Sequence, residues 1–183
     1  MAKYKITDDT IQHGAVTLYR IEALRDIKNG GEIIARKGDL GGYIESENNL
    51  AQDGNAWICG DARICGDARV CGDAWVYDNA RVYGDAWICG DAWVYGDAWV
   101  YGDAWVYGDA RVSDNARVYG NAWICVAARV CGDAWVYDNA RVYGDAWICG
   151  DARVYGDARV YGDAWVSDNA RVYGDYQTGD TKK

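Results

Sequence analysis

The sequence predicts an all-β fold, a triangular parallel β-solenoid of about seven coils with three six-residue walls per coil. Three observations lead to this prediction. They are a six-residue repeat, an alternation of small apolar and larger residues inside each repeat, and a two-residue corner that is usually Gly-Asp or Asp-Asn. A fixed period of this kind is stronger evidence for a fold than the helix or strand propensity of any one segment.

The six-residue repeat runs without an insertion from Ala56 to Asp175, in twenty copies, and GDAWVY and GDARVY are its commonest forms. Ala begins every copy, and two positions later stands Ile in five copies or Val in fifteen. Trp or Arg lies between them, ten of each, and Tyr, Cys or Ser follows in eleven, seven and two copies. The pattern Ala-x-Val-x is typical of a strand with one buried face, and proline is absent.

The two-residue corner explains why such strands would stack into coils. Gly, Asp and Asn tolerate the positive φ angle of a sharp corner. Four strand residues and a corner are too short for a hairpin ladder, but they form one wall of a coil. Three walls close a triangle, so equivalent residues lie one coil apart at about 4.8 Å, the spacing of hydrogen-bonded strands. A six-residue period also does not match the 3.6-residue turn of an amphipathic helix.

The repeat resembles that of left-handed parallel β-helix proteins, whose hexapeptide pattern aliphatic-x-x-x-small-x is matched here by Val-Tyr-Gly-Asp-Ala-Trp over about two thirds of the chain. The resemblance implies a left-handed coil. Composition alone does not imply a left-handed coil, because crossovers in parallel sheets are generally right-handed. The run GDLGGYIESENNLAQDGNAW before the repeat also resembles the leader of a narrower group. These are bacterial and phage hexapeptide-repeat proteins described as transferases or as polymer-forming, cytoskeletal-like proteins.

Three regions are predicted: an N-terminal β cap at 1–42, the solenoid at 43–175, and a polar tail at 176–183. A cap is expected because the open end of a solenoid exposes unpaired strand edges. The tail is too short and polar to cover a coil, so the C-terminal end is predicted to be uncapped.

Within the N-terminal region, the segment 15–22 alternates like a strand, and His13-Gly14 before it predicts a hairpin turn. Ile44 and Leu50 are expected to point inward, as members of two irregular repeats that precede the regular ones.

Composition excludes several classes of function. The chain has 183 residues and a net charge of −9, with 28 acids against 19 bases, so a nucleic-acid partner is not expected. No apolar run reaches the ~18 residues of a membrane span, and no apolar signal segment follows Met1. The odd count of seven Cys, without such a signal, favours free thiols in a cytoplasm.

Because Ala, Val and Ile take the inward positions, every Trp and Cys is expected to point outward, against the usual burial preference. A spacing of eighteen residues sorts the Trp and Arg positions into three faces. The first face, expected to be the most aromatic, carries Trp57, Trp75, Trp93, Arg111, Arg129, Trp147 and Trp165, with Tyr77 and Tyr95 beside them. The second carries Arg63, Arg81, Trp99, Arg117, Trp135, Arg153 and Arg171. The third carries Arg69, Trp87, Trp105, Trp123, Arg141 and Arg159.

Two interpretations of these ladders stay open. In one, stacked rings and Arg over Trp stiffen the solenoid, at about 0.5–1.5 kcal/mol per contact. In the other, the first face binds a partner or a second copy. Its candidate binding residues are Trp57, Trp75, Trp93, Tyr77, Tyr95, Trp147 and Trp165. Because exposed aromatic arrays also hold sugar rings, a glycan is an alternative ligand.

The cysteines and corner acids are predicted to have structural roles. Cys71/Cys89 and Cys131/Cys149 would stack on adjacent coils within disulfide range, but parallel Cβ vectors would strain the bond, so free thiols are expected. No pair has the spacing of a zinc knuckle, and no metal site is predicted. The repeat has 18 Asp against 10 Arg, and side-chain bonds to the turn backbone are expected, with cation binding as the alternative.

One corner departs from the rule, because Val126-Ala127 replaces Gly-Asp, and local softening is expected there.

Many proteins with the resembled β-helix are acyltransferases, typically trimers with an active-site His between subunits and a loop that leaves the coil. The repeat here contains no His, Lys, Glu or loop, and His13, the single histidine, is expected in a turn of the cap. We therefore expect no catalytic residue and no cofactor.

The sequence favours a rigid scaffold that acts by self-association or by binding a protein partner. The contact would be the aromatic face or the C-terminal edge at Val166, Val172, Tyr173 and Tyr176. A carbohydrate-binding module and an acyltransferase-like enzyme are the alternatives.

Overall fold

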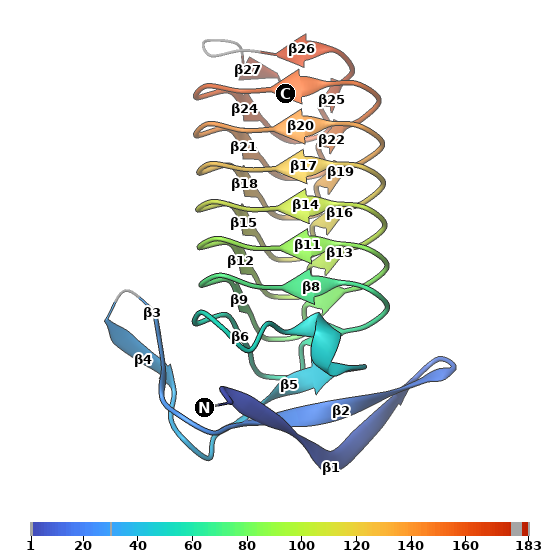
Figure 1. Cartoon of the computed structure of the whole chain (residues 1–183). Coiled ribbons are helices and arrows are strands. Elements are labelled where there is room, and N and C mark those ends of the chain that lie inside the picture. The colour runs from blue at the N-terminus through green and yellow to red at the C-terminus, as the bar shows by residue number, and fades with distance from the viewer. Residues whose placement is uncertain (1, 30, 177–180, 183) are drawn as a thin grey trace.

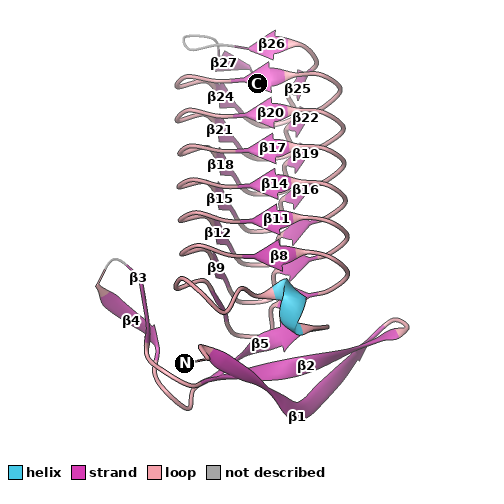
Figure 2. Cartoon of the chain, in the orientation of Figure 1, coloured by secondary structure: helices cyan, strands magenta, loops and turns pink. Residues whose placement is uncertain are grey.

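The computed structural model describes residues 2–29, 31–176, 181 and 182, and for 175, 176, 181 and 182 it describes the backbone alone. A stack of about seven coils stands on a cap of longer strands (Figure 1). The one helical element among the described residues is a short 3-10 helix (Figure 2), so the all-β prediction is confirmed. No helix in the described part of the chain is long and apolar enough to cross a membrane.

Each wall of the solenoid is a sheet of two-residue parallel strands. The first face is formed by β6 (Trp57–Ile58), β9 (Trp75–Val76), β12 (Trp93–Val94), β15 (Arg111–Val112), β18 (Arg129–Val130), β21 (Trp147–Ile148), β24 (Trp165–Val166) and β27 (Thr181–Lys182). The second is formed by β7 (Arg63–Ile64), β10 (Arg81–Val82), β13 (Trp99–Val100), β16 (Arg117–Val118), β19 (Trp135–Val136), β22 (Arg153–Val154) and β25 (Arg171–Val172). The third is formed by β8 (Arg69–Val70), β11 (Trp87–Ile88), β14 (Trp105–Val106), β17 (Trp123–Ile124), β20 (Arg141–Val142), β23 (Arg159–Val160) and β26 (Asp175–Tyr176).

The register of these sheets confirms the predicted coil of three walls. Trp75 pairs with Trp93, and Trp87 pairs with Trp105, so paired residues are eighteen positions apart. The backbone N–H of one coil donates to a carbonyl of the next, as Arg81 does to Ala98 at 2.9 Å. The three faces expected from the sequence are therefore the three faces of the molecule. The handedness of the coil stays a prediction.

The inside of the tube is filled by the small apolar positions of the repeat. The Ala that begins each of the twenty copies and the Ile or Val two positions later are all buried, and none is more than 4 % exposed. Each buried methylene contributes about 0.8 kcal/mol. This aliphatic core places the residue between each Ala and Val on the outer surface.

The corners are held by residues in the left-handed conformation. Most are Gly, but Asp78, Asp114 and Asp138 have φ angles of 61°, 59° and 60°. The carboxylate of each accepts a hydrogen bond from a Gly N–H in the following coil, at 3.3, 3.0 and 3.2 Å. The predicted bonding of corner side chains to backbone is therefore present at these three corners, but its partner lies one coil further on.

The N-terminal cap is built from longer, mostly antiparallel strands. β1 (Tyr4–His13) and β2 (Val16–Ala23) form a hairpin, and β3 (Ile27–Asn29) and β4 (Glu32–Ala35) form another. β5 (Leu40–Ile44) pairs antiparallel with β2 and parallel with β7, so it joins the cap to the second face. The short 3-10 helix η1 (Glu47–Asn49) follows.

Several cap expectations hold in the structure. Ile44 and Leu50 are both fully buried, as the irregular repeats predicted. The hairpin turn also falls after His13, at Gly14 (φ 61°).

The C-terminal end continues the ladder beyond residue 175. β26 pairs with Arg159 and Val160, and β27 pairs with Trp165 and Val166. Part of the segment 176–183, expected to be a polar tail, therefore extends two of the three walls. Residues 177–180 and 183 of that predicted tail lie outside the described residues.

Candidate functional site

The middle of the second face, from Arg81 to Arg153, is a file of alternating Arg and Trp. Arg117 lies between two indoles, with its guanidinium carbon 5.5 Å from the ring centre of Trp99 and 4.9 Å from that of Trp135. Arg81 covers the other side of Trp99 at 4.9 Å, and Arg153 covers Trp135 at 5.0 Å. Both ring faces of each indole are thus occupied by cations, which is a favourable geometry for cation–π attraction.

A ladder of six tyrosines runs beside this file. Its members are Tyr83, Tyr101, Tyr119, Tyr137, Tyr155 and Tyr173. The first five rings are stacked at 4.9 to 5.3 Å between centres and within 9° of parallel. Burial in the stack, with the neighbouring Tyr101 and Tyr137, raises the pKa of Tyr119 to about 12.

The sequence predicted outward ladders of Tyr and Cys beside those of Trp and Arg, but it was not used to single out this all-tyrosine ladder. An unbroken spacing of eighteen residues from Tyr83 was the signal that could have found it.

The first face, expected to be the binding face, is split into two aromatic groups. Trp75 and Trp93 meet edge to face at 5.4 Å, and Tyr77 stacks on Tyr95 at 4.9 Å beside them. Two positions with Arg, on β15 and β18, follow before the next indoles.

The second group of the first face is the pair Trp147 and Trp165, edge to face at 5.8 Å. The structure therefore brings six of the seven candidate binding residues together in two clusters, which the arginines separate.

Trp57, the seventh candidate, is not on the surface, and the expectation that every Trp points into solvent is wrong there. It is 1 % exposed and belongs to the same hydrophobic core as Tyr4, Ile21 and Ile27 of the cap. Trp57 occupies an outward position of the first coil, but the cap covers this coil, so that position becomes interior.

The longest flat stack of indoles lies on the third face. Trp105 stacks on Trp87 at 5.2 Å and on Trp123 at 5.7 Å, with interplanar angles of 4° and 18°. Arg69 and Arg141 close the two ends of this stack, 5.2 and 5.1 Å from the terminal rings. The first face has more Trp, but the third has the more regular array.

The cysteines meet in the pairs that the eighteen-residue spacing predicted, and all seven are free thiols in the structure. Cys71 and Cys89 share a hydrogen bond, which lowers the pKa of Cys89 to about 7 and raises that of Cys71. Burial, with Cys149 beside it, raises the pKa of Cys131 to about 11. The Cys71 thiol therefore stabilises the thiolate of Cys89 by donating its proton to this hydrogen bond.

Several thiols are sheltered by aromatic side chains. The indole N–H of Trp75 donates to the sulfur of Cys59 at 3.2 Å, and that of Trp165 donates to Cys149 at 3.1 Å. Cys125 is only 9 % exposed, and a hydrogen bond with it raises the pKa of Tyr107 to about 12. These cysteines face outward but lie beneath their neighbours.

The residues expected at the C-terminal edge have different positions. Val166 and Val172 are buried at 0 and 2 % exposure, so only their backbone can take part in a contact. Tyr173, at the end of the tyrosine ladder, is 73 % exposed. Tyr176 lies in β26, and its side chain is outside the described part of the structure.

His13 ends β1, at the hairpin turn. Among the residues that the structure describes, no group of three or more His, Cys, Asp or Glu side chains is placed to hold a metal ion.

Comparison with protein families agrees with the ladder of coils. Five segments, 62–77, 74–90, 110–125, 134–150 and 152–168, match the family model described as YdcK beta solenoid repeat. Together they span less than half of the chain. The chain is a β-solenoid repeat protein. No curated protein matches this β-solenoid chain.

Proposed function

We propose that the protein is a non-catalytic, rigid β-solenoid scaffold that acts by self-association through the edge of its terminal coil. The observation that carries the proposal is β25, which ends the ten-stranded sheet and has one hydrogen-bonded neighbour, β22, among the strands that the structure describes. The N–H groups of Arg153 and Tyr155 donate to the coil above, at 2.8 and 3.2 Å. By the same geometry, the N–H groups of Arg171 and Tyr173 point to the open side.

The two outer edges of this sheet differ in their protection. β1, at the other end, carries Asp8 and Asp9 and has a register shift between Ile6 and Thr10. Charged residues and bulges are devices that keep an edge strand from pairing with another chain. β25 pairs in register with β22 and has the exposed ring of Tyr173 beside it. The C-terminal edge is therefore the better template for a second copy.

The test is the molar mass in solution, measured by light scattering over a range of concentrations. Arg171→Pro removes an outward N–H that bonds to no residue in the described part of the chain, while Arg171→Ala keeps that N–H and serves as the matched control. We expect wild type and Arg171→Ala to dimerise and Arg171→Pro to remain monomeric. A wild-type monomer at concentrations up to about 1 mM would contradict the proposal, since association weaker than about −4 kcal/mol is negligible there.

A contact through the first face is the second form of self-association. The edge-to-face cluster of Trp75 and Trp93 favours it, because it presents apolar rings at the surface. The double substitution Trp75→Ser with Trp93→Ser distinguishes the two forms, since only association through the face would weaken. The same variant on a glycan array tests the carbohydrate alternative. On the second and third faces of the solenoid, Arg or Trp side chains already cover the flat sides of the indole rings, which argues against a sugar ring stacking there. The seven free thiols fit a reducing compartment such as the cytoplasm.

A further inference from the structure

The strongest departure from the repeat is at residues 125–127, where Cys125, Val126 and Ala127 replace the usual Tyr, Gly and Asp. Val126 is a β-branched residue with a φ angle of 64°, a conformation that is costly without glycine. Its side chain is 55 % exposed, so burial does not compensate for the strain. Backbone strain that persists at an exposed position is typical of functional sites.

Cys125 leaves a gap between two tyrosines in the file beside the third face, which reads Cys71, Cys89, Tyr107, Cys125, Tyr143 and Tyr161. The register of the strands places Cys125 between Tyr107 and Tyr143, one coil from each. Stacked tyrosines one coil apart, such as Tyr143 and Tyr161, have ring centres 5.3 Å apart. Rings two coils apart therefore leave about 10 Å between their centres, twice the strand spacing. That gap has the thickness of one flat ring stacked on both sides.

The tyrosine below the gap keeps the orientation of a ladder member. The ring of Tyr107 is 6.3 Å from that of Trp123 at an angle of 78°, and in the intact ladder Tyr119 and Trp135 have 6.2 Å and 73°. The gap opens into a groove of about 350 Å³ on the third face. The groove is lined by Tyr107, Trp123, Cys125, Arg141, Tyr143 and Arg159.

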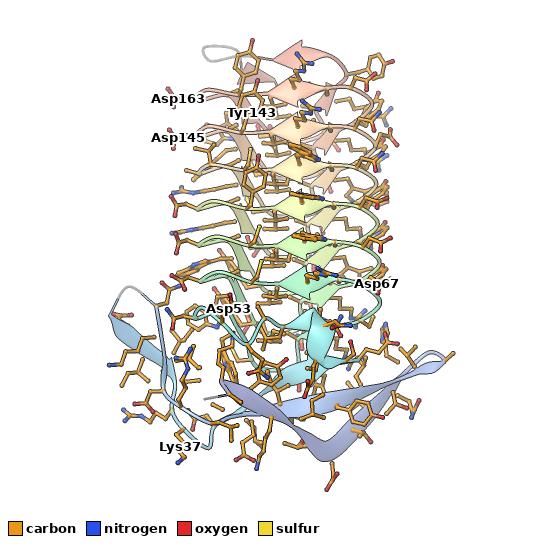
Figure 3. All side chains as sticks on the ribbon, in the orientation of Figure 1. Lys37, Asp53, Asp67, Tyr143, Asp145 and Asp163 are labelled. Carbon is orange, nitrogen blue, oxygen red and sulfur yellow. The ribbon has the colours of Figure 1, made fainter. Side chains whose placement is uncertain are left out.

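The charge pattern around this groove differs from that of the other corners. The corner column before the third face reads Asp67, Asp85, Asp103, Asn121, Asn139 and Asp157. The column after it reads Asp73, Asp91, Asp109, Ala127, Asp145 and Asp163. Figure 3 shows Asp145 and Asp163 at one corner, where Ala127 belongs to the same column.

In the two coils of Trp123 and Arg141, the corners Gly120-Asn121 and Val126-Ala127 carry no acid, whereas Asp138-Asn139 and Gly144-Asp145 carry one each. Arg141 and Arg159 pair on adjacent strands beside the gap. The two corners without an acid, both beside Trp123, and the two adjacent arginines make this groove favourable for an anion on an otherwise acidic protein.

We propose that the groove at Cys125 binds a planar aromatic anion. Its ring stacks between Tyr107 and Tyr143, in the place of the missing tyrosine. Its anionic group, a carboxylate or a phosphate, accepts hydrogen bonds from the guanidinium groups of Arg141 and Arg159. This is a ligand site in addition to the proposed scaffold function, and it does not depend on the association of two chains.

The test is titration calorimetry with 2-naphthoate as the probe and 2-naphthalenemethanol as its neutral counterpart. We expect wild type to bind 2-naphthoate more tightly than the alcohol. Cys125→Tyr fills the gap with the common residue of the repeat and should weaken 2-naphthoate binding about 10- to 100-fold, because two ring contacts are lost. The double substitution Arg141→Gln with Arg159→Gln should weaken the binding of 2-naphthoate but not the binding of 2-naphthalenemethanol.

The matched control is Cys131→Tyr, which fills a notch beside the first face, where Arg111 and Arg129 are accompanied by Asp114. This variant should bind 2-naphthoate as wild type does. Thermal unfolding of both tyrosine variants shows whether the fold is kept. Equal affinity in wild type and Cys125→Tyr, loss of binding in Cys131→Tyr alone, or no heat from wild type at about 1 mM probe would each overturn the proposal.

Discussion

The cap and the solenoid hold their backbones together in different ways. In the solenoid one pattern of contacts recurs in every coil, so each coil depends mainly on its two neighbours. In the cap each contact occurs once. The buried amide of Asn49 donates to the carbonyls of Gly66 and Ala68 at 2.9 and 2.8 Å and accepts from Glu45 and Ser46 N–H groups at 3.1 and 2.9 Å.

The same contrast is visible at Lys3. Its buried ammonium donates to the carbonyl of Ala56 at 2.8 Å and to that of Asp53 at 3.3 Å, inside the end of the tube. Nothing in the repeat uses a charged side chain in this way, since the core of the coils is aliphatic. The cap therefore supplies specific polar contacts where the tube ends, and the coils supply identical apolar layers.

The sharpest test of this difference removes the same side chain in both regions. Trp57→Ala empties the junction between cap and first coil, and we expect a loss of about 3–5 kcal/mol in the free energy of unfolding. Trp165→Ala removes an indole that is 48 % exposed near the other end, with an expected loss of about 1 kcal/mol. Urea unfolding of both variants makes the measurement. Equal losses would mean that the cap does not bury Trp57 as the structure shows.

Predictability follows the same division. The walls, the corners and the three faces follow from the sequence because one six-residue rule recurs and each copy has the same neighbours eighteen residues away. Trp57 broke the rule because another coil lies on only one side of it, and on the other side it meets cap residues such as Tyr4, which no period relates to it. The carbonyl partners of Lys3 and Asn49 were likewise unpredictable, since they depend on how an irregular segment folds over the tube.

The candidate site contains both features that the repeat predicts and features that it does not. Sequence spacing correctly grouped the outer residues into files, since each file follows from the register. It did not indicate that rings in the first face meet edge to face while those of Trp87 and Trp105 lie flat, because side-chain rotation is set by the residues on both sides.

A second test uses pH, because Lys3 of the cap and two groups of the solenoid ladders, Cys131 and Tyr119, change stability with opposite sign. Burial, with Arg25 nearby, lowers the pKa of Lys3 from 10.5 to about 8. Between those values the unfolded chain binds a proton that the folded chain does not, so this lysine makes the folded state more stable as pH rises. In the solenoid the pKa values of Cys131 and Tyr119 are raised to about 11 and 12. There the folded chain keeps protons that the unfolded chain loses, so stability falls as pH rises.

Lys3→Met separates the two contributions. The free energy of unfolding of wild type relative to this variant should increase by on the order of 2 kcal/mol between pH 7.5 and 10.5. The control is Lys5→Met, which removes an exposed ammonium paired with Glu22 at 3.0 Å. Urea titrations under reducing conditions at several pH values provide the data. A difference that stays constant with pH would show that Lys3 is not desolvated beneath the cap.

The smallest expected effect concerns a defect within the solenoid itself. Val126→Gly removes the Cβ that strains the backbone at φ 64°, and we expect the free energy of unfolding to rise by about 1 kcal/mol, the relief being partly offset by the greater freedom of glycine in the unfolded chain. Gly144→Val is the matched reverse change, one coil further in the same corner column. A Cβ there would lie 2.9 Å from the backbone nitrogen of Gly162, so this variant should lose stability. Thermal unfolding compares the two, and a lower midpoint for Val126→Gly would show that the corner is stabilised by its valine rather than strained by it.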